Sequence, residues 1–292
     1  MLQDVEEMQV AVGVLHIVIA IILPPINVRF IYIFLSRKHY RDMECYRIMA
    51  LTGILQLFAG PGAFCFGLLQ LIGSDQHDIL LFFSIIFAAS IATDLLLNLV
   101  LALNRVKVIL HLPMLPCITK MFMALACLYG ITYTAALLSP YCGYLIAPGH
   151  YVGSYDFSKP YTQLFSEVNS IVRLTSTSLT FFCYLIIIVN LLWLRSHSTS
   201  AFNKEWSILI CAGFRFAIDT SLAIVFFFVR LPPSPWSELA VGVTYILNQL
   251  LVSPLLYFIF TETLRKEFLE IFRSQQVSNV SSAAYHTFSR HV

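Results

Sequence analysis

Residues 79–105 read ILLFFSIIFAASIATDLLLNLVLALNR, and this stretch decides the class of fold. Between Ile79 and Leu103 the single ionisable side chain is Asp94, and Arg105 follows soon after. A helix of roughly 20 apolar residues crosses the hydrocarbon layer of a bilayer. The stretch therefore predicts a membrane-spanning helix that carries one carboxyl group about half-way along.

The rest of the chain shares this apolar character. Of its 292 residues, 58% are hydrophobic and 12% are charged, and the mean hydropathy is +0.78. Soluble domains average roughly 25% charged residues. The composition therefore excludes a soluble domain, a disordered chain and a nucleic-acid-binding protein, and it indicates an integral membrane protein surrounded by the lipid bilayer.

Seven stretches are long and apolar enough to span a bilayer, and none alternates polar with apolar residues, so we expect helices and not barrel strands. The predicted fold is an all-α seven-transmembrane helix bundle. Its predicted spans are Val10–Phe34, Ile48–Ile72, Ile79–Leu103, Cys117–Ala147, Val168–Leu194, Trp206–Val229 and Leu239–Phe260.

The distribution of Lys and Arg predicts the orientation of the bundle. These residues gather in the segments after the first, third, fifth and seventh spans, whereas the opposite segments hold Lys159 and Arg230. Because Lys and Arg favour the cytoplasmic side, the N-terminus is predicted outside and the C-terminus inside. The predicted organisation is an extracellular segment at 1–9, the bundle at 10–260, a short amphipathic helix on the inner membrane surface at 261–273 and a disordered cytoplasmic tail at 274–292.

Several polar residues lie at membrane depth, where they are costly and often functional. If the spans that carry them face one another, they form a buried cluster around one carboxyl group. Two interpretations stay open: a site for a sodium ion or a proton, or a hydrogen-bonded packing network with a neutral carboxyl group. The residues of this predicted cluster are Gln56, Asp94, Asn98, Gln249 and Ser253.

Other charged residues within the predicted spans include a pair on the sixth span and an arginine on the fifth. Arg215 and Asp219 are four residues apart, so they share one face of the sixth span and can pair, either as a structural pair or as part of a helix that moves. Arg173 lies near the outer end of the fifth span. It either extends outward to water or binds an anionic group of a ligand.

The segment between the fourth and fifth spans, residues 148–167, is rich in aromatic rings and is predicted to be an irregular lid. A cavity between helix ends beneath such a lid is a plausible site for a small molecule. The residues predicted to line it are Phe83, Phe87, Tyr155, Arg173 and Tyr245. The cysteines and histidines show no metal-binding spacing, so no metal site is expected.

Three short motifs carry a resemblance to a known family. They are Glu44-Cys-Tyr-Arg-Ile-Met49, Ala102-Leu-Asn-Arg105 and Ser253-Pro-Leu-Leu-Tyr257. In this order and at these depths, the chain resembles the nematode chemosensory serpentine receptors, which are rhodopsin-like seven-transmembrane G-protein-coupled receptors, and most closely class T. The resemblance covers about residues 10–272.

The resemblance implies a sensory-neuron receptor in the plasma membrane, and in the cilia of that neuron, which binds an unknown small-molecule ligand and activates a heterotrimeric G protein. It places Arg105 at the G-protein interface and assigns a helix switch to Pro254 and Tyr257. The chain departs from the family pattern at Asn104, where an acid is usual, and at Ser253, where asparagine is usual. No cysteine stands at the head of the third span, so the common disulfide to the lid is not expected.

Sequence features expected for other classes of membrane protein are weak or missing. The seventh span contains no lysine, which excludes attached retinal, and no protease motif accompanies the buried acids, so an enzyme is not expected. A multi-pass transporter or channel is the remaining alternative. That class predicts broken helices at mirrored positions in the two halves, and the prolines of this sequence show no such pair.

Overall fold

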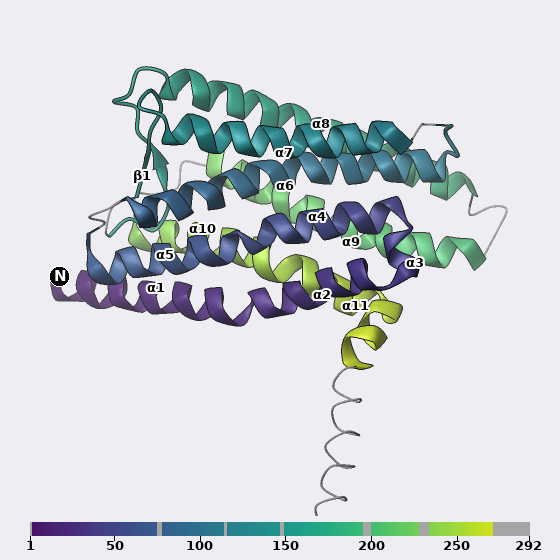
Figure 1. Cartoon of the computed structure of the whole chain (residues 1–292), viewed down its shortest axis with the longest axis horizontal. Coiled ribbons are helices and arrows are strands. Elements are labelled where there is room, and N and C mark those ends of the chain that lie inside the picture. The colour runs from purple at the N-terminus through teal and green to yellow at the C-terminus, as the bar shows by residue number, and fades with distance from the viewer. Residues whose placement is uncertain are drawn as a thin grey trace, which may run out of the picture.

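The computed structural model describes residues 2–74, 78–113, 116–146, 149–194, 200–227 and 234–270. Their long helices run side by side along one axis, and a small hairpin closes one end of the bundle (Figure 1). The helices are α1 (Leu2–Ile22), α2 (Pro24–Ser36), α3 (Lys38–Arg41), α4 (Glu44–Leu57), α5 (Ala59–Ile72), α6 (Ile79–Ile109), α7 (Pro116–Leu138), α8 (Thr162–Leu194), α9 (Ser200–Phe227), α10 (Pro235–Leu247) and α11 (Ser253–Phe260), with a π turn η1 (Asn248–Val252) between the last two.

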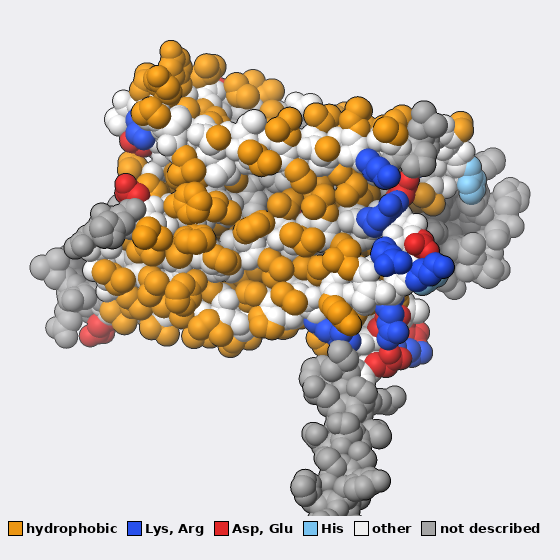
Figure 2. All heavy atoms as spheres, viewed as in Figure 1, with side chains coloured by type: hydrophobic (Ala, Val, Ile, Leu, Met, Phe, Trp, Pro, Cys, Tyr) orange, Lys and Arg blue, Asp and Glu red, His pale blue; other side chains and the backbone are white. Residues whose placement is uncertain are grey.

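The seven-helix membrane bundle predicted from the sequence is confirmed. Six helical segments of the described chain are long and apolar enough to cross a bilayer: Glu7–Ser36, Glu44–Ile72, Ile79–Ile109, Cys117–Leu138, Thr162–Asn190 and Pro235–Phe260. The one remaining span, the sixth in chain order, is α9, which carries Arg215 and Asp219. Hydrophobic side chains cover the long sides of the bundle, and Lys and Arg gather at the end near α3, as Figure 2 shows. We call this end the basic end and the opposite one the lid end.

Proline residues explain where spans are interrupted. Pro24 and Pro25 begin α2, and Pro254 follows the π turn in the seventh span. A proline cannot donate a backbone hydrogen bond, so it leaves the carbonyl group four residues earlier without its helical partner. For Pro254 that carbonyl belongs to Leu250, and the side-chain amide of Asn27 donates to it at 2.5 Å. This contact joins the first span to the seventh.

The boundaries of the fourth and fifth spans differ from the prediction. The fourth was expected to run to Ala147, but α7 ends at Leu138, just before Pro140, which disfavours helical backbone in the residue preceding it. The fifth was expected to begin at Val168, but α8 begins at Thr162. The hydroxyl group of Thr162 accepts a hydrogen bond from the backbone N–H of Gly143 at 3.0 Å, which fixes the chain at the start of the helix.

The lid is partly regular, which corrects the prediction of an irregular loop. Strand β1 (Tyr144–Leu145) pairs antiparallel with β2 (Ser154–Tyr155), so that Tyr144 lies opposite Tyr155. Their rings pack edge to face with centroids 6.1 Å apart. Such cross-strand aromatic pairs stabilise short ladders, which explains why a hairpin forms among residues rich in glycine and proline.

Residues 262–270 are helical, as expected for the segment after the seventh span. Leu264 is fully buried in a hydrophobic cluster with Phe30, Phe34 and Met49, and Phe268 stacks on Phe30 with ring centroids 5.0 Å apart. This helix therefore packs on the basic end of α2 and α4. The predicted tail at 274–292 and the last residues of the predicted amphipathic helix lie outside the described residues.

Close contact between α1 and α5 depends on two glycines. A Cβ atom at position 67 would lie 2.6 Å from the carbonyl oxygen of Gly13, and one at position 13 would lie 2.9 Å from that of Gly67. Small residues allow membrane helices to approach closely and to gain dispersion contacts along their backbones. The pair therefore sets the separation of the first two spans.

We predict that Gly67→Ala lowers the stability of the bundle by about 1–3 kcal/mol, because the added methyl group would meet a backbone atom that cannot move alone. Gly213→Ala on α9 is the matched control, since a Cβ atom there meets nothing within 4 Å. Thermal unfolding in detergent measures both. Equal melting temperatures for the two variants would contradict the assigned role of Gly67.

Candidate functional site

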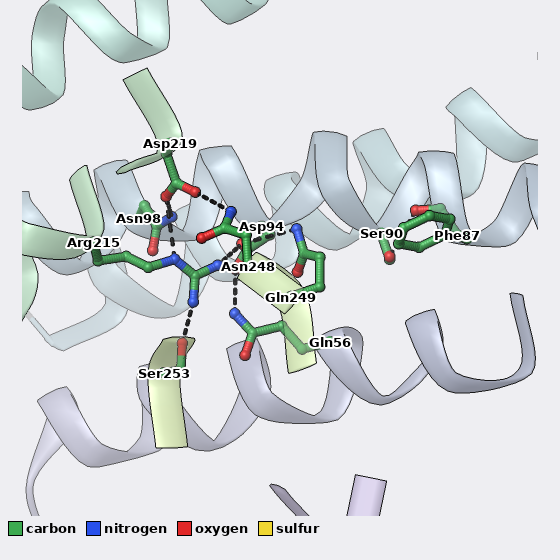
Figure 3. Close-up of polar contacts among 10 residues, drawn as sticks. All are labelled: Gln56, Phe87, Ser90, Asp94, Asn98, Arg215, Asp219, Asn248, Gln249 and Ser253. Carbon is green, nitrogen blue, oxygen red and sulfur yellow. Dashed lines mark hydrogen bonds and ion pairs between the residues drawn. The ribbon is translucent and has the colours of Figure 1, made fainter. Parts of the chain in front are cut away.

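A buried polar cluster lies half-way along the bundle, and Asp94 on α6 is at its centre (Figure 3). Gln56 of α4 donates to one carboxylate oxygen of Asp94 at 3.1 Å, and Gln249 of the π turn lies 3.4 Å from the other. The side chain of Asp94 is 3% exposed. Three spans distant in sequence thus converge on one carboxyl group, as their matching depths predicted.

Arg215 of α9 is the second centre of the cluster. Its guanidinium group donates to Asp94 at 2.5 Å, to Asp219 at 3.2 Å and to the hydroxyl group of Ser253. The predicted pair with Asp219 is present, but Arg215 also reaches across the bundle to α6 and α11. The i,i+4 spacing could reveal only the local partner, because it says nothing about how α9 is rotated toward its neighbours.

Amide groups complete the cluster around the second acid. Asn98 of α6 donates to Asp219 at 3.0 Å, and Asn248 of the π turn donates to it at 2.6 Å. Two carboxylates and one guanidinium therefore share a network that joins α4, α6, α9 and the seventh span. A sodium ion beside Asp94 stays a prediction, and the guanidinium group already brings a positive charge to that carboxylate. Ser90 lies apart and donates to the carbonyl of Phe87 within its own helix (Figure 3).

A cavity of about 740 Å³, which we call the lid cavity, lies under the hairpin at the lid end. Four of the five residues predicted to line a ligand site do line it: Phe87, Tyr155, Arg173 and Tyr245. Phe83 is not among the residues that line this cavity, and its ring packs edge to face on Phe82. A role for Phe83 in ligand binding stays a prediction.

Polar contacts that the sequence did not suggest hold the lid over this cavity. The side-chain amide of Gln70, at the end of α5, donates to the carbonyl of His150 at 2.9 Å and accepts from the N–H of Gly149 at 3.0 Å. Glu238 in the first turn of α10 accepts from the N–H of Tyr151 at 3.0 Å. Burial, and then the negative charge of Glu238, raise the pKa of Tyr151. In the sequence, only the position of Gln70 near the end of an apolar helix hinted at these contacts with the lid.

A chain of hydroxyl and amide groups ties the hairpin to α7 and α8. The hydroxyl groups of Tyr133 and Tyr155 are 2.9 Å apart, and Asn169 donates to Tyr155 at 2.8 Å. Tyr129 in turn donates to Asn169 at 2.7 Å. No disulfide forms among the described residues, and Cys142 beside the hairpin is a buried thiol. Hydrogen bonds therefore hold this lid where other receptors use a disulfide.

At the basic end, Arg105 is 6% exposed and donates to the thiol of Cys45 on α4. The neighbouring Asn104 donates to Glu44 at 2.9 Å, and Lys107 contacts the same oxygen of Glu44 at 2.9 Å. Thr119 of α7 lies 3.4 Å from that oxygen. An acid of α4 therefore contacts the neighbours of Arg105 on α6, and the sequence did not suggest this position for Glu44.

Tyr257 and Pro254 lie between the cluster and the basic end. The ring of Tyr257 packs edge to face on Phe30 and Phe34, with centroids 5.7 and 5.6 Å apart. A small cavity of about 40 Å³ adjoins it, and its lining includes Asn98, Arg215, Ser253 and Tyr257. Tyr257 thus packs on the apolar side chains of α2 and shares a cavity with residues of the polar cluster.

Comparisons with known proteins agree with this arrangement. A family model described as "Serpentine type 7TM GPCR chemoreceptor Srt" matches residues 1–281. The chain belongs to the Srt chemoreceptor family. Because that family is a class of receptors, the protein is not an enzyme. No curated protein matches the chain.

The fold of this Srt receptor is similar to a solved receptor structure. Squid rhodopsin superposes with a TM-score of 0.74 at 12% sequence identity, and the match covers 91% of this chain and 81% of that one. An identity this low concerns the fold alone. The rhodopsin fold is therefore kept although Asn104 and Ser253 depart from the usual pattern and no disulfide holds the lid.

We predict that Arg215→Met lowers the stability of the Srt receptor by roughly 3–5 kcal/mol, because Asp94 and Asp219 would lose the cation that they share inside the membrane. The triple variant Arg215→Met, Asp94→Asn and Asp219→Asn removes all three charges together. It is expected to recover much of the loss. Melting temperatures in detergent test both, and an unchanged value for the single variant would contradict this account.

Proposed function

We propose that this Srt receptor binds a small molecule in the lid cavity and activates a heterotrimeric G protein at the basic end. The observation that carries the proposal is the series of shared cavity walls and hydrogen bonds that runs from the lid cavity through the polar cluster to Tyr257. The lid cavity shares Tyr245 and Arg173 with a smaller cavity lined by Asp94 and Asp219. Arg215 then connects these acids to Ser253 and to the cavity beside Tyr257.

The proposed orientation puts the lid end outside the cell. On the face that Figure 2 shows, most Lys and Arg side chains gather at the other end, which suits the cytoplasmic face of the plasma membrane. The N-terminus is then extracellular and the C-terminus cytoplasmic. A chemoreceptor with this orientation presents its cavity to environmental molecules, as in the exposed cilia of a sensory neuron.

The proposed mechanism is a shift between two helix arrangements. A ligand that binds one arrangement more tightly increases its population. Roughly 1–3 kcal/mol of coupling free energy is enough for a useful response. We expect the basic end of α9 to move and to open a groove beside Arg105 for a helix of the Gα subunit. In the resting arrangement Arg105 is buried against α4, so this opening is needed to expose it.

We predict that Arg105→Ala abolishes ligand-dependent nucleotide exchange by a reconstituted G protein, since the groove would lose the side chain expected at its centre. The receptor is measured in nanodiscs with a promiscuous Gα subunit and a panel of small odorants, and surface expression is measured in cells. Arg41→Ala is the control, because Arg41 is an exposed arginine at the same end. Exchange that persists in Arg105→Ala would remove Arg105 from this role, and a wild-type receptor that never promotes exchange would contradict the proposed function.

Glu44→Gln is predicted to raise basal nucleotide exchange about fivefold, the factor for roughly 1 kcal/mol at a partly exposed ion pair. The change keeps the size of the side chain but weakens its hold on Asn104 and Lys107. Glu262→Gln is the matched control, because that carboxylate pairs with Lys266 on an exposed helix face. Basal exchange that is the same in both variants would show that Glu44 does not stabilise the resting arrangement.

A further inference from the structure

The lid cavity is unequal in charge between its mouth and its floor. Glu238, in the first turn of α10, is engaged by the lid: it accepts from the N–H of Tyr151 and lies 3.3 Å from the ring nitrogen Nδ1 of His150. Arg173 also lines the cavity, from α8. Glu238 therefore binds the lid. Arg173 places a positively charged guanidinium group in the wall of the cavity.

Arg173 marks the floor of the cavity. It lies about three turns inside α8, which begins at Thr162. It also lines a second cavity of about 20 Å³, together with Asp94, Asp219 and Asn248. Arg173 therefore stands inside the bundle, between the ligand cavity and the polar cluster. This position favours binding of a ligand over outward extension to water, the other alternative that the sequence left open.

The remaining walls of the lid cavity suit an apolar body. They come from α5, α6, α10 and the hairpin, and aromatic rings predominate among them. Apolar walls with few polar groups at fixed positions are characteristic of small-molecule sites, and a volume near 740 Å³ is within their usual range. Apolar and aromatic residues of these walls include Phe66, Phe87, Ile91, Tyr144, Phe157 and Ile246.

We propose that the lid cavity takes an amphiphilic carboxylic acid, with its carboxylate on Arg173 and its apolar body directed toward the lid. The inference rests on the proposed function in so far as this cavity is the ligand site. A planar guanidinium group binds a carboxylate with two parallel hydrogen bonds. A phosphate dianion would bring a second negative charge close to Asp94 and Asp219, which line the neighbouring cavity. An amine would be repelled by Arg173.

The same placement tells how such a ligand influences the receptor. A carboxylate on Arg173 brings a negative charge to the edge of the small cavity that Asp94 and Asp219 also line. The positive field of Arg173 is then shared between the ligand and these two acids. A ligand bound at Arg173 therefore changes the electrostatic environment of Asp94 and Asp219, the two acids that Arg215 pairs with.

Three probes with one apolar body test the proposal: phenylpentanoate, phenylpentanol and phenylpentylamine. Each is added at up to millimolar concentration to the purified full chain in nanodiscs of neutral phosphatidylcholine. The rise in melting temperature with concentration gives the affinity. We expect the acid to bind roughly tenfold or more tightly than the alcohol, since hydrogen bonds between charged groups are stronger than neutral ones, and the amine to bind least.

Two substitutions at the floor and one at the mouth locate the charge. Arg173→Gln should abolish the preference for the acid but keep binding of the alcohol, which also shows that the variant is folded. Arg173→Lys should keep part of the preference, because it retains the positive charge without the planar fork. Glu238→Gln should leave the order of the three probes unchanged.

Several outcomes would overturn the proposal. They are equal binding of acid and alcohol, an acid affinity that Arg173→Gln leaves intact, a preference for the amine that Glu238→Gln removes, and no binding of any probe. These measurements need no G protein. Binding of the acid without nucleotide exchange would therefore contradict the proposed function but support this inference. Nucleotide exchange driven by uncharged molecules alone would support the proposed function but contradict this inference.

Discussion

The arrangement of the bundle depends on a balance of charge in its interior. Asp94 is buried and Asp219 is half-buried at membrane depth, and the guanidinium group of Arg215 contacts both. Removing charged groups from water is expensive, and mutual attraction offsets that cost only where the geometry and the remaining hydrogen bonds are satisfied. Amide groups from α4, α6 and the π turn supply those bonds, with Gln56, Asn98 and Asn248 as donors. Each of these helices is therefore fixed in rotation as well as in position.

A second constraint acts on the backbone. Lipid offers no hydrogen bonds, so every carbonyl or N–H group that a helix break leaves without a partner has to find one within the protein. Asn27 meets this need at the break before Pro254, where it binds the carbonyl of Leu250. Gln70 meets it at the lid, where one side-chain amide binds two consecutive backbone groups. Neutral side-chain amides thus satisfy backbone groups, as Arg215 satisfies the carboxylates. The contacts of Asn27, Gln70 and Arg215 with Asp94 join segments far apart in sequence.

Hydropathy predicted the seven spans, and a common depth predicted that Gln56, Asp94 and Gln249 meet, because a span fixes height in the membrane to within about a turn. The sequence could not predict the long-range partners of Arg215 or the role of Glu44. A long side chain selects its partner by the rotation of its helix, and apolar residues on every face of a span hide that rotation. The lid hairpin was missed for a different reason: its strands are two residues each, too short for any alternation to be recognised.

Glu44, an acid at the basic end, joins the ends of three helices. An acid beside Arg105 in sequence would restrain that arginine within α6 alone. Glu44 instead stands on α4 and contacts Asn104 and Lys107 of α6 and Thr119 of α7, while Cys45 beside it contacts Arg105. These contacts exist only while the ends of the three helices stay together. The restraint is thus a property of helix packing, so any separation of α6 from α4 releases the hold on Asn104, Lys107 and Arg105 in one step.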